Sequence, residues 1–200
     1  MRTFAIMATA ALAMTAPAQA ADFSDPTWPC IQRKVERLSP GLMWPHPIEE
    51  MEHSPETAAA IDDLAARIAL RRVSLDELAP RIEAFVAAHG SDPALLGQVF
   101  KAGFERLSAQ RRAIIAGIED YSLKQIALSE RIDETRVEMN RLMEADAPDY
   151  DRVDALEERL AWDERIFTDR AQSLTYVCET PILLEKRLHA IARMLLDAAG

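Results

Sequence analysis

The sequence predicts an all-α protein, a small helical bundle with a long antiparallel coiled-coil hairpin. Ala, Leu, Glu and Arg are frequent in this chain of 200 residues, whereas aromatic residues make up only 6% and glycines number six. This composition favours helices over a β-sandwich or barrel. A heptad pattern also runs through two long segments, and only a short turn separates them. Two such helices must fold back on each other.

The first 20 residues have the pattern of a secretory signal peptide. Met1 and Arg2 give a short basic start, and residues 3–14 are almost entirely apolar. Ala18 and Ala20 are the small residues that a signal peptidase requires, so we expect cleavage after Ala20. The apolar run is shorter than the roughly 18 residues of a membrane span. We therefore expect a periplasmic protein that does not span the membrane after cleavage.

The chain has two cysteines, Cys30 and Cys178, and both follow the predicted cleavage site. In an oxidising compartment an isolated pair is usually a structural disulfide. Two free thiols or a redox-active pair are the alternatives. Catalytic dithiols usually have the spacing C-x-x-C, which this sequence lacks. The sequence therefore predicts a disulfide between Cys30 and Cys178.

Residues 21–53 carry aromatic residues flanked by proline, at Trp28 and Trp44. The four- and three-residue spacing of Ile31, Val35 and Leu38 predicts one edge of a two-turn helix between them. This segment is too poor in regular pattern to fold alone. We expect it to lie as a strap across a larger helical domain formed by residues 54–200.

Two short helices open that domain, at about 55–72 and 75–89. Ser54 and Pro55 form a helix start, because serine caps helices and proline favours their first position. Ser74 and Glu77 have the spacing of a capping box. Pro80 predicts that the second helix is kinked or starts late.

Two long helices follow, at about 93–145 and 150–197, with a tight turn at 146–149. The seam residues of the first alternate in steps of four and three: Ile114, Ile118, Tyr121, Gln125, Leu128, Ile132, Thr135, Met139 and Leu142. The second continues the pattern: Val153, Leu156, Leu160, Asp163, Phe167, Arg170, Leu174 and Val177. The turn pairs Leu142 with Val153, and therefore Leu128 with Phe167 and Gln125 with Arg170. The resulting two-helix projection would reach roughly 40 Å.

The apolar stripe of the long helices widens towards their far ends, where it includes Phe100, Leu183 and Leu188. A wide stripe needs more than one partner helix. We expect the two short helices and the strap to supply that cover, which gives a bundle at the base of the projection.

Five apolar residues of the projection lie off the seam: Leu123, Ile126 and Val137 on the first long helix, and Trp162 and Ile166 on the second. All of these except Val137 are candidates for partner binding. Isolated exposed apolar residues are common and need no function. Trp, however, is enriched in the energetic centres of protein interfaces. Trp162 and Ile166 are four residues apart, so they share one edge of the helix.

His46 and His53 flank three glutamates in the strap and are weak candidates for a divalent-metal site. Their spacing matches no compact metal motif, and a charged loop before a helix is common. We expect no cofactor. A metal- or small-ligand-binding module at the junction of strap and bundle stays open as an alternative function.

The net charge of −10 disfavours nucleic-acid binding, because phosphates require a basic surface. No nucleophile motif, zinc-binding helix or phosphate loop is present in the sequence, so we expect no enzyme. These observations predict a non-enzymatic periplasmic protein that binds another periplasmic or envelope protein through its hairpin. It would act as a scaffold, an adaptor or a holdase-type chaperone, and the sequence also allows a homo-oligomer.

Residues 25–35 (DPTWPCIQRKV), followed by Leu38-Ser39-Pro40 and Trp44, resemble the start of uncharacterised secreted proteins of alphaproteobacteria. The resemblance covers about 20 residues of this chain. It implies a bacterial periplasmic address and assigns no catalytic residue.

Overall fold

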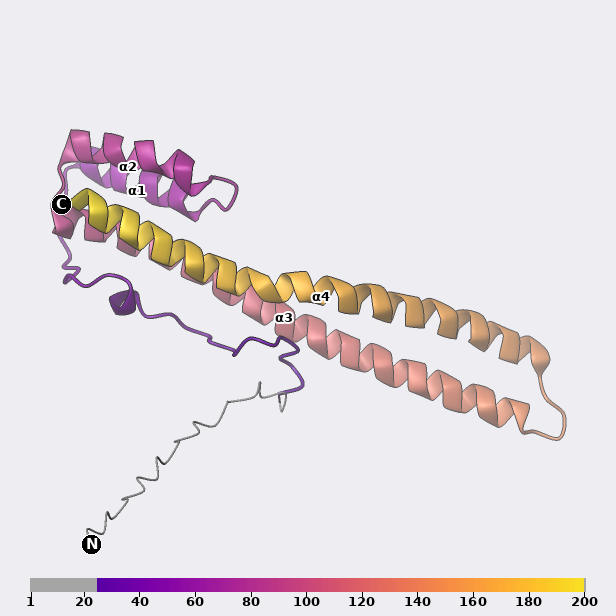
Figure 1. Ribbon diagram of the computed structural model, residues 1–200. Helices are drawn as coiled ribbons and strands as arrows, with labels where there is room; N and C mark the ends of the chain where they lie inside the picture. The colour runs from indigo at the N-terminus through magenta and orange to yellow at the C-terminus, as the bar shows by residue number, and fades with distance from the viewer. Residues whose placement is uncertain (1–24, 200) are drawn as a thin grey trace, which may run out of the picture.

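The computed structural model describes residues 25–199, and in that range the chain forms four α-helices and no strand (Figure 1). They are α1 (Pro55–Ala69), α2 (Leu75–His89), α3 (Pro93–Met143) and α4 (Tyr150–Ala199). The predicted class, an all-α bundle with a long antiparallel hairpin, is confirmed. The expected signal peptide lies outside the described residues.

Side-chain caps define where the helices begin. The Ser54 hydroxyl accepts a hydrogen bond from the Thr57 amide at 3.2 Å, and the Ser74–Glu77 capping box is complete. Because α2 begins at Leu75 and continues through Pro80, the expectation of a late start is wrong. Gly90 ends α2 with φ at 98°, a backbone conformation that residues with a Cβ rarely adopt.

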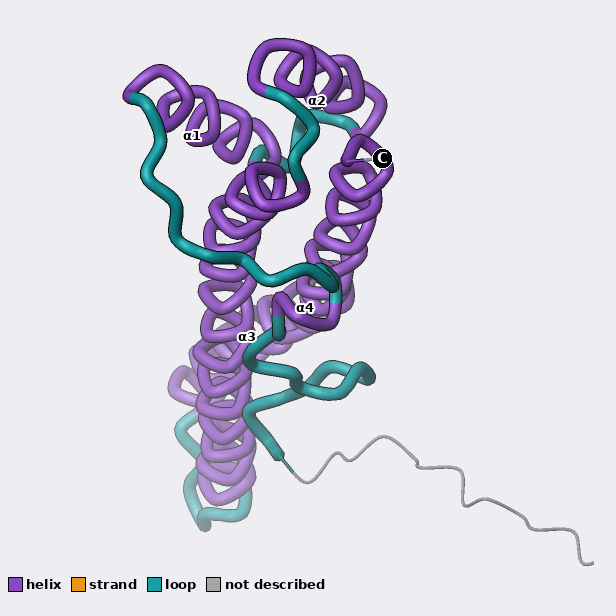
Figure 2. Tube along the Cα trace, turned by 90° about the vertical axis from the view of Figure 1, so that its left-hand side faces the viewer, coloured by secondary structure: helices purple, strands orange, loops and turns teal. Residues whose placement is uncertain are grey.

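α3 and α4 lie antiparallel and side by side along their whole length (Figures 1 and 2). Their register can be followed from contacts across the seam. Gln125 donates to the Phe167 carbonyl at 3.1 Å, and Arg131 pairs with Asp163 at 2.8 Å. These contacts agree with the register in which Leu128 lies opposite Phe167. Within residues 25–199, no helix combines the length and apolar character of a membrane span.

Two seam positions of α4 were predicted incorrectly. Arg170 is exposed and Val177 is 41% exposed, while Cys178 beside Val177 is buried. Gln125 therefore does not face the Arg170 side chain. At Val177 the reason is the strap, which packs against the hairpin from one side and holds the neighbouring Cys178 in a second core through the disulfide.

The base of the hairpin is covered on two opposite sides. α1 packs on α3 and α2 packs on α4, whereas the strap runs along the other side (Figures 1 and 2). The core between them contains fully buried side chains from every helix: Ile68, Leu78, Leu96, Val99, Phe100, Leu107, Leu184, Leu188, Ile191 and Leu195. Trp44 of the strap stacks on Phe100 with ring centroids 5.3 Å apart.

The strap contains no helix between Ile31 and Leu38, so the two-turn helix predicted there is wrong. Its only helical part within residues 25–53 is the 3₁₀ turn Pro40–Leu42. Ile31 is 75% exposed and Val35 43%, so only Leu38 of the suggested apolar edge packs against the core. Two turns are too short to be stable alone. The strap instead satisfies its backbone through side chains, because the Val35 carbonyl accepts from Arg111 and the Gln32 carbonyl accepts from Trp28.

Candidate protein-binding face of the arm

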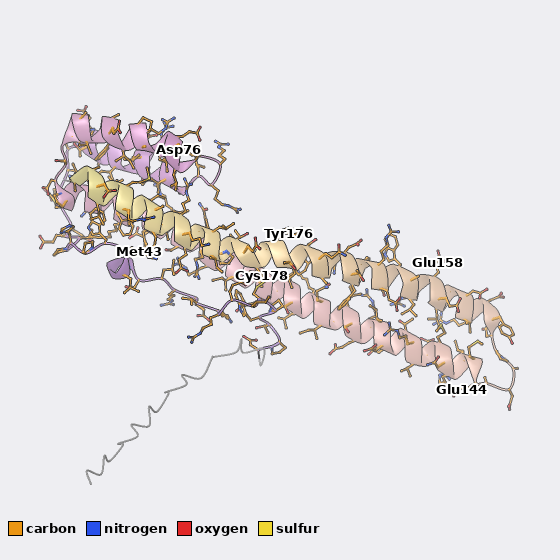
Figure 3. All side chains as sticks on the ribbon, in the orientation of Figure 1. Met43, Asp76, Glu144, Glu158, Tyr176 and Cys178 are labelled. Carbon is orange, nitrogen blue, oxygen red and sulfur yellow. A yellow bond between two sulfur atoms is a disulfide. The ribbon has the colours of Figure 1, made fainter. Side chains whose placement is uncertain are left out.

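The part of the hairpin from residue 119 to residue 178 projects beyond the base, and we call it the arm. Its inner end is marked by Cys178, and its outer end by the turn after Glu144 (Figure 3). Apart from the strap at its inner end, no other described element packs on it. The arm is therefore built almost entirely from two helices.

The strap closes one side of the inner arm. The Cys30 and Cys178 sulfurs are 2.03 Å apart, so the expected disulfide is present, across a sequence separation of 148 residues. Ser122 donates to the Pro26 carbonyl at 2.8 Å, and Lys34 forms an ion pair with Glu119. Beneath these polar contacts the strap forms a small second core from Trp28, Cys30, Ile115, Ile118 and Cys178.

Arg111 is a buried cation at the point where the strap, α3 and α4 meet. Its guanidinium donates to the carbonyls of Val35 and Pro181, and Glu185 lies 3.8 Å away. Burial lowers the pKa of Arg111 from its ordinary value, but the group stays protonated because that value is so high. With all its main contacts inside the protein, Arg111 has a structural role at the junction.

The seam of the outer arm contains one buried carboxylate, Asp163. Both of its oxygens accept hydrogen bonds from Arg131, at 2.8 and 2.9 Å. These hydrogen bonds lower the pKa of the Asp163 carboxyl below its ordinary value, so it is ionised at neutral pH. A bidentate pair fixes both side chains, and here it links the two helices across the seam.

The flank of α4 that lies away from the strap carries a second row of residues, which we call the α4 stripe. Its members are spaced alternately by four and three residues: Trp162, Ile166, Asp169, Ser173, Tyr176, Thr180 and Leu183. This is the spacing of a helix-packing face. Trp162 is 64% exposed, Tyr176 77% and Leu183 54%, so the face has no partner within the described chain.

The α4 stripe continues a face that is covered at the base. The next position in the row after Leu183 is Arg187, which donates to the carbonyls of Ile68 and Leu70 at the end of α1. On α3, Gln110 likewise donates to the Ala69 carbonyl, while one heptad further Gly117 lies in open space. The α1–α2 hairpin thus covers this face up to Arg187, and beyond that point it is open.

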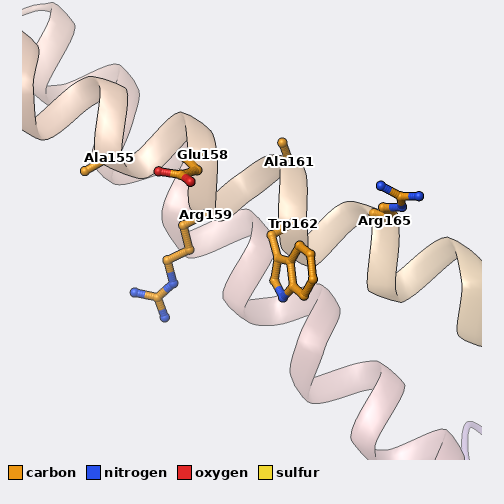
Figure 4. Close-up of a pocket in the computed structure, with 6 residues that line it drawn as sticks. All are labelled: Ala155, Glu158, Arg159, Ala161, Trp162 and Arg165. Carbon is orange, nitrogen blue, oxygen red and sulfur yellow. The ribbon is translucent and has the colours of Figure 1, made fainter.

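A shallow hollow of about 470 Å³ lies beside Trp162 on the α4 stripe (Figure 4). Its walls come from α4 alone: Ala155, Glu158, Arg159, Ala161, Trp162 and Arg165. The indole forms an apolar wall, and charges of both signs surround it. This arrangement suits a flat protein surface with an apolar centre and a polar rim.

The four predicted partner-binding residues do not form one surface. Trp162 and Ile166 belong to the α4 stripe, and Ile166 is half-buried. Ile126, also half-buried, lies towards the side on which the strap packs, and Leu123 lies on the outer face of α3 with 53% exposure. Heptad positions explain the separation, because Ile126 and Ile166 flank the seam from opposite sides.

Sequence reasoning missed Tyr176 and assigned Leu183 to the base core. The assignment of Leu183 was wrong, since the side chain is 54% exposed. The signal that could have identified both is the regular spacing from Trp162, which a search limited to the seam does not follow. Alternating steps of four and three connect Trp162 to Tyr176 and to Leu183 without interruption.

His46 and His53 are not brought together with a third ligand. Across residues 25–199 no group of three or more His, Cys, Asp or Glu side chains could hold a metal ion. The His46 ring lies edge-on to Trp44 at 6.0 Å, and the buried Nε2 atom of His53 has no hydrogen-bond partner among the described residues. A metal site involving these two histidines stays untested.

Comparison with protein-family models, with curated proteins and with solved structures returned no match to this chain. The resemblance of its residues 25–44 to secreted alphaproteobacterial proteins therefore stays a prediction.

Proposed function

We propose that this is a non-enzymatic periplasmic protein that binds another protein through its arm, as a scaffold, an adaptor or a holdase-type chaperone. The α4 stripe is the contact surface. The observation that carries this proposal is the open continuation of a packing face, with Trp162, Tyr176 and Leu183 more than half exposed. Faces of this kind in one chain are completed by a helix from another.

The periplasmic address rests on two independent features. The first 20 residues have the composition of a cleaved signal peptide. The chain also uses its two cysteines for one disulfide, which persists in oxidising compartments and is rare in the cytosol. Both features support the same localisation.

The energetic centre of the surface is Trp162. A tryptophan contributes a large apolar area at a small cost in side-chain entropy, and such residues dominate binding energy at interfaces. Glu158, Arg159 and Arg165 around it form a polar rim. Their charges add specificity more than affinity, because exposed ion pairs are weak.

Site-specific photo-crosslinking in living cells tests the proposed function. A photoreactive phenylalanine analogue is placed at Trp162 or Tyr176, with Leu123 and Val137 as matched exposed positions on α3. We expect protein adducts from the two α4 positions and none from the two α3 positions. Equal adducts from all four positions, or none at all, would show that the α4 stripe is not a specific binding surface.

A further inference from the structure

The α4 stripe is complementary to itself when it is read in the opposite direction. Its polar residues Asp169 and Ser173 lie at the centre, and apolar residues lie on both sides of them. We propose that the stripe is covered by a second copy of this chain, α4 packing antiparallel on α4 about a two-fold axis between Asp169 and Ser173. This inference rests on the proposed function and names the partner of the same surface.

The layers of such a contact follow from the spacing of the stripe. Asp169 meets Ser173 of the second copy, Ile166 meets Tyr176, and Trp162 meets Thr180, and symmetry repeats each layer. The Ser173 hydroxyl already donates to the Asp169 carbonyl of its own helix at 3.0 Å, so its burial leaves no unsatisfied donor. Ile166 and Tyr176 therefore form two apolar layers around a small polar centre.

Charged residues beside the stripe support a second copy as the occupant. In this antiparallel register Arg165 lies opposite Glu179 of the second copy, and Glu158 lies opposite Lys186. All four side chains are exposed, and none forms an ion pair within residues 25–199. Symmetry doubles both contacts, so the dimer gains four pairs of opposite charge.

The same charges disfavour alignments of the two α4 helices that are shifted by one heptad. A slip of one heptad towards the turn places Glu158 opposite Glu179, and a slip towards the base places Arg165 opposite Lys186. Each slip brings like charges together twice because of the two-fold axis, and like charges at an interface are unfavourable. The Arg165–Glu179 and Glu158–Lys186 pairs thus favour this alignment over slips of one heptad.

The α1–α2 hairpin limits the overlap of the two helices. It covers α4 from Arg187 onwards, about 24 Å from the proposed axis at 1.5 Å per residue. Antiparallel helices usually cross at about 20°, so the two helices separate with distance from the axis, and the contact is tightest at the inner Arg165–Glu179 pairs. The outer end of the second arm then passes beside the α1–α2 loop.

The expected affinity is modest. The contact buries Trp162 and Tyr176 from both copies, and each ring contributes about 150–250 Å². Together the four rings supply about half of the roughly 1,600 Å² that a standard interface buries. We therefore expect a dimer with a dissociation constant in the micromolar range.

Sedimentation of the purified, oxidised protein between about 1 μM and 1 mM tests the proposal, since this range brackets the expected affinity. The wild-type protein should shift from monomer to dimer. Arg165→Glu and Glu179→Lys should each weaken the dimer at least about five-fold, because repulsion replaces attraction at two symmetric contacts. The double variant R165E/E179K restores opposite charges and should recover most of the affinity. Val137→Glu, on an exposed position of α3, is the matched control and should have no effect.

Two results would overturn the proposal. One is a protein that stays monomeric at 1 mM, and the other is a dimer that either single variant leaves unchanged or that the double variant fails to restore. Circular dichroism of each variant verifies folding, which substitutions at these exposed positions should not disturb. The photo-crosslinking experiment separates this inference from the proposed function, because adducts with a different protein from a monomeric chain would support the function and refute the second copy.

Discussion

The two sides of the α3–α4 pair are covered to different lengths. On one side the strap reaches from the base to Cys178, where the disulfide fastens it. On the other side the α1–α2 hairpin stops at Arg187. The three tryptophans reflect this difference, because Trp28 and Trp44 of the strap are 6% and 2% exposed while Trp162 is 64% exposed.

This difference separates residues that hold the fold from residues that are free for binding. On the strap side, the two tryptophans are buried, and side-chain hydrogen bonds and the disulfide hold the strap to the hairpin. On the α4 stripe, the apolar residues continue with helix-packing spacing although no described element packs on them. Substitutions on the two sides should therefore have opposite consequences, for stability on one side and for binding on the other.

The largest loss of stability is expected in the base, at Phe100. Its ring is 1% exposed and lies between Trp44 of the strap and Phe104. Phe100→Ala should lower the free energy of unfolding by about 3–5 kcal/mol, because it removes a large buried ring and leaves a cavity. Chemical denaturation measures this change. A loss below about 1 kcal/mol would mean that strap and bundle do not share one core.

The disulfide should have the next largest effect, confined mostly to the strap. Replacing Cys30 and Cys178 by serine should cost about 2–5 kcal/mol, since the bond closes a long loop. The region around Trp28 should become sensitive to protease, while circular dichroism shows the arm still helical. If the region around Trp28 resisted protease equally in the oxidised protein and in the double serine variant, the disulfide would not be what fastens the strap.

Asp163 provides a smaller, pH-dependent contribution to the outer arm. The pKa of Asp163 is lower in the folded protein than in the unfolded chain. The ionised carboxylate therefore stabilises the fold above about pH 4, and this contribution is lost as the pH falls below that value. Asp163→Asn should therefore destabilise the protein at pH 7 by about 1–2 kcal/mol. The difference from wild type should shrink below about pH 4.

Thermal unfolding over a series of pH values measures this prediction. Asp154→Asn is the matched control, because Asp154 is an exposed acid of the same helix. A difference between wild type and Asp163→Asn that stays constant from pH 7 to pH 3 would exclude the ionised carboxylate as its cause.

The smallest effect on stability is expected on the α4 stripe. Trp162→Ala should change the free energy of unfolding of the monomer by less than about 0.5 kcal/mol, because the ring is mostly exposed. Denaturation at low protein concentration, where the chain is monomeric, isolates this value. A loss of several kcal/mol would show that Trp162 supports the fold and is not free for binding.

Local sequence signals predicted the helices well because each signal acts within a few residues. The Ser54 cap, the Ser74–Glu77 capping box and the uninterrupted heptads each report on their own segment. The strap was harder to predict. Its conformation depends on Arg111, which lies far away in the sequence and binds the Val35 carbonyl. No spacing within residues 31–38 encodes that contact.

The candidate site was only partly predictable for a similar reason. Sequence spacing identified Trp162 and Ile166 as off the seam, and the structure places them on the α4 stripe. It could not show that Leu183 is open whereas Arg187, four residues further, is covered. That boundary is set by where the α1–α2 hairpin ends, which is a property of tertiary packing and not of α4 itself.

Fluorine NMR of protein labelled with fluorotryptophan tests most directly whether a second copy of the chain covers the open side of α4. The chain has three tryptophans, so Trp28 and Trp44 act as internal controls for Trp162. The Trp162 resonance, assigned from a Trp162→Phe variant, should shift as the protein concentration rises from about 1 μM to 1 mM, the range that brackets a micromolar dissociation constant. The other two should not move. Constant chemical shifts for Trp162 over that range, or a shift of Trp28 or Trp44 in its place, would contradict the account.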